Sequence, residues 1–158
     1  MTPTFAKLNL KDHTRIAVLN APASFEPDLA ALHGVTVVRD VADAGELGFA
    51  LAFVTRQREV DSLGKAIAKS AKGDAVVWFA YPKGSSKKYK SEINRDGGWK
   101  VLGTAGFEPV RMVAIDADWS ALRFRRVEFI KTMTRAKEHR MSPGGQARPG
   151  KAGPAKRG

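Results

Sequence analysis

Short apolar runs separated by helix or turn signals limit most strongly how this chain can fold. Four such runs lie before residue 81, at Arg15–Leu19, Val35–Val38, Phe49–Val54 and Ala75–Ala80. They are continuous rather than alternating, which is typical of parallel strands covered on both faces. Strands that alternate with helices predict a parallel sheet with right-handed crossovers. We therefore expect an α/β fold with a helical layer on each side of the sheet.

Helices are predicted in three of the connecting segments. Residues 25–32 follow Ser24, a good helix-capping residue. Over residues 59–72, apolar side chains recur at spacings of three and four while lysines fall on the other side, which predicts an amphipathic helix. A shorter helix is expected from about residue 89 or 91 to residue 103.

Two further strands are expected at Val110–Ile115 and Ala121–Arg125. The connection between them, residues 116–120, is too short for a crossover and permits only an antiparallel hairpin. We therefore predict a three-layer sandwich whose mostly parallel sheet ends in a C-terminal antiparallel hairpin, with its last strand at the edge.

The positive charge of the chain is unevenly distributed. The net charge is +11 over 158 residues, and residues 135–158, with seven Lys/Arg and one Glu, account for +6 of it. This tail is rich in Pro, Gly, Ala, Lys and Arg and lacks an apolar anchor larger than alanine after residue 141. We predict one α/β domain over residues 1–134 and a disordered basic tail over 135–158 that attracts nucleic acid or another polyanion.

The composition excludes several kinds of chemistry. The chain has no cysteine, and therefore no disulfide, thiolate nucleophile or cysteine-ligated metal. His13, His33 and His139 lie far apart without ligand-like spacing, so we predict no metal site and no catalytic residue. No run approaches the roughly 20 apolar residues of a membrane span, and no signal peptide is apparent. We expect a cytoplasmic protein without membrane contact.

Four sequence motifs between residues 20 and 124 are specific in their order and spacing. They are Asn20-Ala-Pro22, Trp78-Phe-Ala-Tyr-Pro-Lys-Gly-Ser-Ser86, Asn94-Arg-Asp96 and Ala114-Ile-Asp-Ala-Asp-Trp-Ser-Ala-Leu-Arg-Phe124. On these motifs the chain resembles an uncharacterised family of small bacterial α/β domains, over roughly residues 8–126. Together with the order of the elements, the resemblance implies a Rossmann-like sheet of the class I methyltransferase type. The family has no established activity, so the resemblance implies no catalytic residues.

The loop after the first strand, residues 20–25, lacks the glycines of a cofactor-binding turn. In Rossmann sheets that bind dinucleotides or S-adenosylmethionine, glycines let the backbone approach the ligand closely. Pro22 also removes one backbone N–H donor. We therefore expect a degenerate sheet without a cofactor. The alternative is an enzyme that binds S-adenosylmethionine through an atypical loop. Asp40, at the end of the second strand, could hold a ribose, but a lone acid at a strand end is more often a cap or turn former.

A basic loop follows the fourth strand and precedes the third predicted helix. Residues 83–100 contain six Lys/Arg and two acids, a local charge of +4. Backbone N–H groups and hydroxyls at a helix N-terminus can bind an anion. We predict an anion site made by Lys83, Gly84, Ser85, Ser86, Lys87 and Arg95. The alternative interpretation is a capping serine, a solvated lysine surface and a weak ion pair between Arg95 and Asp96.

A second set of residues is a candidate pocket beside this loop: Asn20, Asp116, Trp119, Ser120 and Arg123. Asp116, Ser120 and Arg123 would supply an acid, a hydroxyl and a cation. The alternative is that Asp116 and Ser120 form a turn and that Trp119 packs over the sheet edge.

These patterns favour a non-catalytic binding or regulatory domain that contacts an anionic, phosphate-bearing ligand. Two alternatives remain from other classes of function. One is an enzyme of methyltransferase-like fold with an atypical cofactor loop. The other is an accessory nucleic-acid-binding protein that uses the tail and the basic face.

Overall fold

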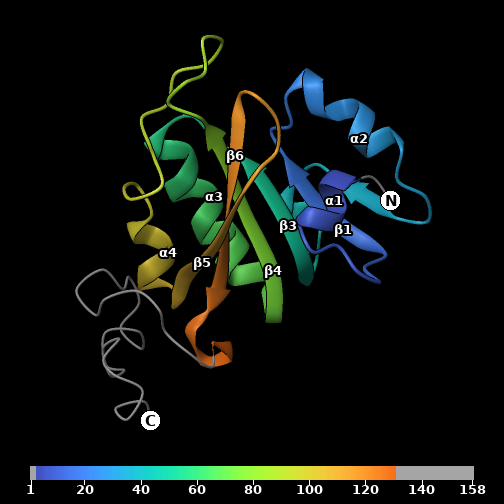
Figure 1. Cartoon of the computed structure of the whole chain (residues 1–158). Helices are drawn as coiled ribbons and strands as arrows, with labels where there is room; N and C mark the ends of the chain where they lie inside the picture. The colour runs from blue at the N-terminus through green and yellow to red at the C-terminus, as the bar shows by residue number, and fades with distance from the viewer. Residues whose placement is uncertain (1–2, 131–158) are drawn as a thin grey trace, which may run out of the picture.

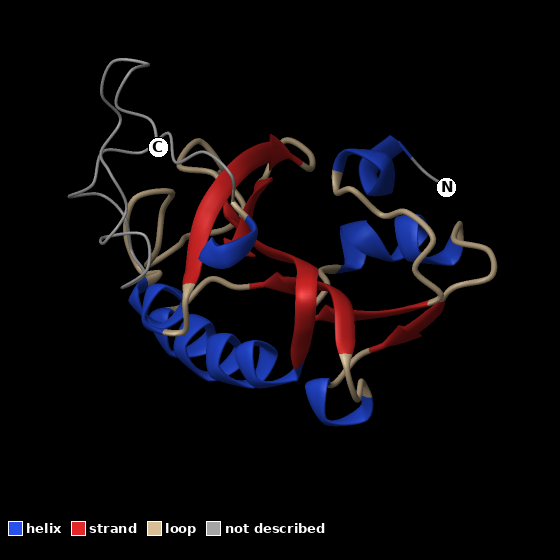
Figure 2. Cartoon of the chain, turned by 90° about the horizontal axis from the view of Figure 1, so that it is seen from below, coloured by secondary structure: helices blue, strands red, loops and turns tan. Residues whose placement is uncertain are grey.

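The computed structural model describes residues 3–130, which form one six-stranded sheet with helices on both faces (Figures 1 and 2). The strands are β1 (Arg15–Leu19), β2 (Thr36–Val38), β3 (Leu47–Phe53), β4 (Ala71–Pro82), β5 (Phe107–Ala114) and β6 (Trp119–Arg126). The helices are α1 (Pro3–Lys7), α2 (Glu26–Ala30), α3 (Gln57–Ser70) and α4 (Lys100–Thr104), with 3₁₀ turns η1 (Ala23–Phe25), η2 (Val41–Asp43) and η3 (Val127–Phe129). The tail at 135–158 lies outside the described residues.

The strand order is β2-β1-β3-β4-β6-β5. The pairs among β2, β1, β3 and β4 are parallel, and β6 is antiparallel to both of its neighbours. The prediction of a mostly parallel sheet with a C-terminal antiparallel hairpin is confirmed. The expected position of the last strand is wrong, because β6 inserts between β4 and β5 and leaves β5 at the edge. Burial explains this order: Ala121, Leu122 and Phe124 of β6 are buried, whereas Val110 and Met112 of β5 are exposed.

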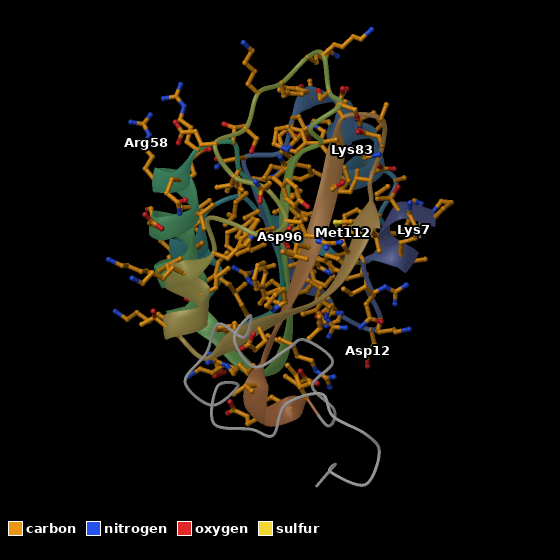
Figure 3. The ribbon with its side chains drawn as sticks, turned by 60° about the vertical axis from the view of Figure 1, so that its left-hand side comes forward. Lys7, Asp12, Arg58, Lys83, Asp96 and Met112 are labelled. Carbon is orange, nitrogen blue, oxygen red and sulfur yellow. The ribbon has the colours of Figure 1, made fainter. Side chains whose placement is uncertain are left out.

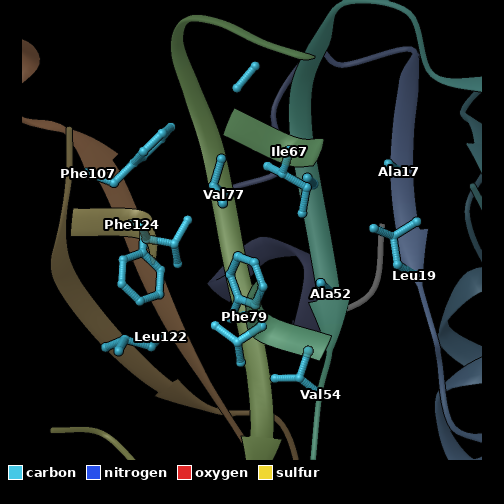
Figure 4. Close-up of a cluster of buried hydrophobic side chains, with 14 of the residues drawn as sticks. Ala17, Leu19, Ala52, Val54, Ile67, Val77, Phe79, Phe107, Leu122 and Phe124 are labelled. Atoms are coloured by element: carbon cyan, nitrogen blue, oxygen red, sulfur yellow. The ribbon is translucent and has the colours of Figure 1, made fainter. Parts of the chain in front are cut away.

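Each face of the sheet has its own hydrophobic core. On one face, α3 and α4 cover a cluster that includes Ile67, Val77, Phe79 and Phe124 (Figure 4). On the other face, α1, α2 and η1 cover a second cluster with several aromatic rings, among them Phe5, Phe25, Phe49, Phe53, Trp78 and Trp119. This arrangement is the predicted three-layer sandwich.

Helix α1 is an element that the sequence patterns did not predict. Its only buried side chain is Phe5, which packs against Phe25 at 5.5 Å and Phe49 at 6.3 Å between ring centroids. Just after the helix, the carbonyl of Leu8 accepts a 2.7 Å hydrogen bond from the indole N–H of Trp78. The start of the described chain is therefore fixed to the middle of the sheet by packing and by one buried hydrogen bond.

The helix predicted from residue 89 or 91 to 103 is wrong over most of its length, because only α4 is helical. Side chains in this segment bind nearby backbone and compete with helical hydrogen bonds. Ser91 Oγ donates to the Ile93 carbonyl at 2.6 Å, and Asn94 Oδ1 accepts from the Asp96 N–H at 2.9 Å. Residues 83–99, which we name the strap, leave the carboxyl end of β4 and pass the start of α3 on the way to α4 (Figure 1).

No helix within residues 3–130 is long and apolar enough to cross a membrane.

Candidate ligand-binding site

A cleft of about 600 Å³ lies beside the carboxyl ends of β1 and β2 and continues along α3. Its lining combines polar groups with an apolar wall: Leu19, Asn20, Arg39, Asp40, Val41, Ala42, Gly45, Ser62, Leu63, Ala66, Lys69 and Ser70. The cleft exists because the connection from β2 to β3 contains only the short turn η2. No helix of that connection covers this part of the sheet, so the side of α3 remains accessible.

Asn20 gives the turn after β1 a conformation that normally requires glycine. Its φ is +59°, in the left-handed region, and it lines the cleft. Among residues other than glycine, asparagine and aspartate adopt this region most readily. The missing glycine in residues 20–25 was the main reason for expecting no cofactor. Because Asn20 adopts the left-handed conformation, the missing glycine does not exclude a tight turn here.

Asp40 and Arg39 follow the end of β2. Asp40 Oδ1 accepts from the Ala42 N–H at 3.0 Å and so caps η2. Within residues 3–130, the other carboxylate oxygen has no hydrogen-bond donor and remains available at the cleft. Arg39 forms a two-pronged pair with Glu26 at 2.8 and 2.9 Å, and this hydrogen bonding lowers the pKa of Glu26. The Arg39–Glu26 pair joins the end of β2 to the start of α2.

The strap covers the neighbouring carboxyl end of β3. The Glu92 N–H donates to the Thr55 carbonyl at 2.9 Å, and Glu92 Oε1 accepts from the Gln57 N–H at 2.9 Å. Glu59 Oε1 accepts from the N–H groups of Thr55 at 2.8 Å and Arg56 at 3.1 Å. Carboxylates of the chain itself therefore occupy donors at the start of α3, whereas the neighbouring cleft at the ends of β1 and β2 is accessible.

The predicted anion loop is held in place by Asp118. The Lys83 N–H donates to the Asp118 carbonyl at 2.7 Å, and Ser86 Oγ donates to Asp118 Oδ1 at 2.9 Å. Ser86 Oγ also accepts from the N–H groups of Lys88 and Tyr89. Ser86 is thus a turn-forming residue bound to an internal carboxylate.

The other members of the predicted anion set lie at or near the surface. Gly84, Ser85 and Lys87 are exposed, and Lys83 is partly exposed at the end of β4 (Figure 3). Arg95 pairs with Asp96 at 3.5 Å, and both side chains are mostly exposed. No helix starts at this loop, so the helix N-terminus that supported the predicted anion site is absent.

The candidate pocket beside the loop is not brought together as one site. Asp116 Oδ1 accepts from the N–H groups of Asp118 and Trp119 and forms the turn between β5 and β6. Trp119 is buried, with its ring 5.1 Å from that of Phe53 and 5.0 Å from that of Tyr89. The turn at Asp116 matches the alternative interpretation, but Trp119 packs in the core of an internal strand rather than over the sheet edge, and Ser120 lies in β6 rather than in the turn.

Ser120, Arg123 and Asn20 lie in different places. In the register of β6 with β4, Ser120 faces Tyr81 and Arg123 faces Trp78. Tyr81 and Trp78 belong to the cores on opposite faces of the sheet, so Ser120 and Arg123 point to opposite sides. Asn20 lies at the end of β1 in the cleft.

Sequence reasoning missed the α3 wall of the cleft, formed by Ser62, Leu63, Ala66 and Lys69. Ser62, Ala66 and Lys69 are spaced by four and three residues and share one side of the helix, but this spacing does not reveal that the side is uncovered. The short segment between the second and third strands was the available signal. Within residues 3–130, no group of three or more His, Asp or Glu side chains could hold a metal ion.

Solved structures with a similar architecture include proteins described as methyltransferases. TrmN from Thermus thermophilus matches with 10% identity and a TM-score of 0.51, over 78% of this chain and 47% of that one. A SAM-dependent methyltransferase from Aquifex aeolicus matches with 12% identity and a TM-score of 0.51, over 78% and 87%. A putative type 11 methyltransferase from Sulfolobus solfataricus matches with 10% identity and a TM-score of 0.50, over 83% and 81%.

These likenesses establish a Rossmann-like fold of the methyltransferase type and, at such low identity, the fold alone. This chain spans about half the length of TrmN. No protein-family model and no curated protein matches the sequence.

Proposed function

We propose that this domain binds a small nucleoside-type ligand, with S-adenosylmethionine as the first candidate, in the cleft at the ends of β1 and β2. The observation that supports this proposal is the left-handed turn at Asn20 beside Asp40 in a cleft of about 600 Å³. Ligands of open α/β sheets bind outside the carboxyl ends of the strands near the point where strand order reverses. In this sheet that point lies between β1 and β3, and the cleft adjoins it at the end of β1. A volume of this size is typical of small-molecule sites.

The side chains of the cleft suit the parts of such a ligand. The unpaired carboxylate oxygen of Asp40 would accept a hydrogen bond from a ribose hydroxyl. The side-chain amide of Asn20 would bind a polar group of the ligand near the end of β1. Val41, Leu63 and Ala66 would pack against the base. Bound S-adenosylmethionine would supply an electrophilic methyl group. The strap covers the end of β3, so we propose a binding role without methyl transfer.

Asp40→Asn tests this proposal while keeping an oxygen that can cap η2. Because an amide is a weaker acceptor for a ribose hydroxyl, the affinity for S-adenosylmethionine should fall by roughly tenfold, which is about 1.4 kcal/mol. The measurement is isothermal titration of the full chain with S-adenosylmethionine, S-adenosylhomocysteine and adenosine. The unfolding temperature without ligand should stay close to that of the unmodified chain.

Asp43→Asn is the matched control, since Asp43 is an exposed residue of η2 that does not line the cleft. Ala66→Leu should also weaken binding by narrowing the cleft. If the unmodified chain binds none of the three compounds, or if Asp43→Asn weakens binding as much as Asp40→Asn, the proposal is wrong.

A second candidate function is binding of a phosphate-bearing ligand at the basic loop. The observation that favours it is that residues 83–90 contain four lysines and no acid, and that Asp118 fixes the loop at the sheet edge. Lys83, Gly84, Ser85 and Lys87 would contact the anion. The tail at 135–158 would add attraction that does not depend on sequence and weakens with salt.

Lys83→Ala should weaken binding of inorganic pyrophosphate several-fold without lowering the unfolding temperature, because a partly exposed cation is removed. Lys100→Ala, at an exposed lysine on α4, is the control of equal charge. Equal affinities in a titration of both variants would exclude Lys83 as a ligand residue.

A further inference from the structure

Two arginines face each other directly across the β5–β6 hairpin. The register places Arg123 of β6 between Trp78 of β4 and Arg111 of β5, in one row on the α1 side of the sheet. Facing residues of antiparallel strands have Cβ atoms about 5 Å apart, and like charges in that position destabilise the pair. The fold therefore keeps two positive charges together on a surface where a neutral pair would be more stable.

Among the described residues, neither arginine forms an ion pair with a carboxylate, although the nearby charge of Asp74 partly offsets the lowering of the Arg123 pKa. Arg125, the next β6 residue on the same side, is paired with Asp74 at 2.6 and 2.8 Å. Within residues 3–130, the side chains of Arg111 and Arg123 form no ion pair or hydrogen bond, and Nε of Arg123 is buried without a partner. Burial, and then the nearby charge of Arg125, lower the pKa of Arg123. Arginine stays protonated in proteins, so the unpaired charge remains.

The two carboxylates near this pair, Asp74 and buried Glu108, lie toward Arg125, while the Arg111 side is open. Arg111 is exposed on the edge strand, and neither arginine lines the cleft. Lys7 of α1 donates to the carbonyl of Ala114 at 2.6 Å, near the end of the same strand (Figure 3). Small molecules bind in concave sites, whereas an open row of cations suits an extended polyanion.

We propose that Arg111 and Arg123 bind phosphate groups of a nucleic-acid backbone, with Lys7 as a flanking charge. Guanidinium groups offer forks of N–H donors that match phosphate oxygens in charge-assisted pairs. An anion between the two arginines would supply the missing acceptors and remove their mutual repulsion. Contacts to phosphates carry no sequence information, so binding should be independent of sequence and sensitive to salt. This site is separate from the cleft and does not depend on the proposed ligand there.

The test is fluorescence anisotropy of a labelled oligouridylate with the full chain, repeated over a series of salt concentrations. Arg111→Gln and Arg123→Gln should each weaken binding and reduce the slope of log affinity against log salt by about 0.7, the value for one lost contact to a single strand. Arg58→Gln on α3 is the control, since Arg58 is exposed and belongs to the opposite face. The tail is present in every variant, so its contribution cancels.

Arg111→Gln also distinguishes a role of Arg111 in binding phosphate from a role in stabilising the fold. Removing one of two facing like charges should leave the unfolding temperature equal to or higher than that of the unmodified chain, and should reduce the rise in that temperature caused by inorganic phosphate. Unchanged salt slopes in both variants, or equal losses with Arg58→Gln, would overturn the proposal. Polyglutamate that binds as tightly as the oligouridylate, with the same dependence on Arg111, would overturn the assignment to nucleic acid.

Discussion

Backbone conformation at single residues decides two features of this molecule. Asn20 keeps a left-handed turn at the end of β1 without glycine. Gly98, in the strap, has φ +103° and lies where a Cβ atom would be 2.4 Å from Cγ2 of Ile93. The first position tolerates a side chain that can line the cleft. The second excludes any side chain, because Ile93, which is also in the strap, is buried and occupies that space.

Gly98→Ala should therefore destabilise the domain by about 1–3 kcal/mol, through both the unfavourable φ and the clash with Ile93. Denaturant unfolding of the full chain measures this change. Gly84→Ala is the control, since a Cβ there meets no atom within 4 Å and its φ is not positive. Equal stability of the two variants would mean that the backbone at Gly98 relaxes without cost.

At the scale of elements, the strap behaves as a long connection fixed by side chains rather than by regular structure. It contacts α3 through Glu92, whose carboxylate accepts from the Gln57 N–H, and through the Gly98 carbonyl, which accepts from the Gln57 side chain at 2.8 Å. The backbone N–H of Glu92 also donates to the Thr55 carbonyl. A carboxylate at a helix N-terminus satisfies a free donor and interacts favourably with the helix dipole.

Glu92→Ala should lower stability by about 1 kcal/mol and speed amide hydrogen exchange in the strap and the first turn of α3. Mass spectrometry of exchange resolves these two segments. Glu46→Ala changes an exposed glutamate outside both segments and should leave their exchange unchanged. If amide exchange in Glu92→Ala is as slow as in the unmodified chain, then packing of Ile93 and Trp99 holds the strap without the carboxylate.

The elements also show what the sequence can and cannot predict. The internal strands β1, β3 and β4 were predictable because their apolar runs are dictated by burial on both faces, and α3 was predictable from its amphipathic spacing. The helix expected near residues 89–103 fails because Ser91 and Asn94 bind local backbone, a competition that propensity does not resolve. Asn20 was predicted as a site residue from the sequence. The α3 residues that line the same cleft were not, because the sequence does not show which side of α3 the rest of the fold leaves uncovered.

At the scale of the whole molecule, the two cores share one sheet. Strands β1, β3, β4 and β6 contribute residues to both clusters, so the two cores lie on opposite faces of the same strands. The described residues hold 19 Lys/Arg and 15 Asp/Glu, a net charge of +4 from a chain total of +11. Residues after 130 therefore carry most of the net positive charge of the chain.

The edge strand β5 has one further consequence for the behaviour of the chain in solution. An unpaired edge can add a strand from another molecule, and bulges, prolines and charges hinder this. β5 has all three, with Pro109 next to a break in register before Arg111. Exposed Val110 and Met112 lie on either side of that charge. Arg111→Gln removes a charge that hinders strand addition at this edge, so the variant should aggregate more readily. Light scattering should therefore accompany every measurement on it.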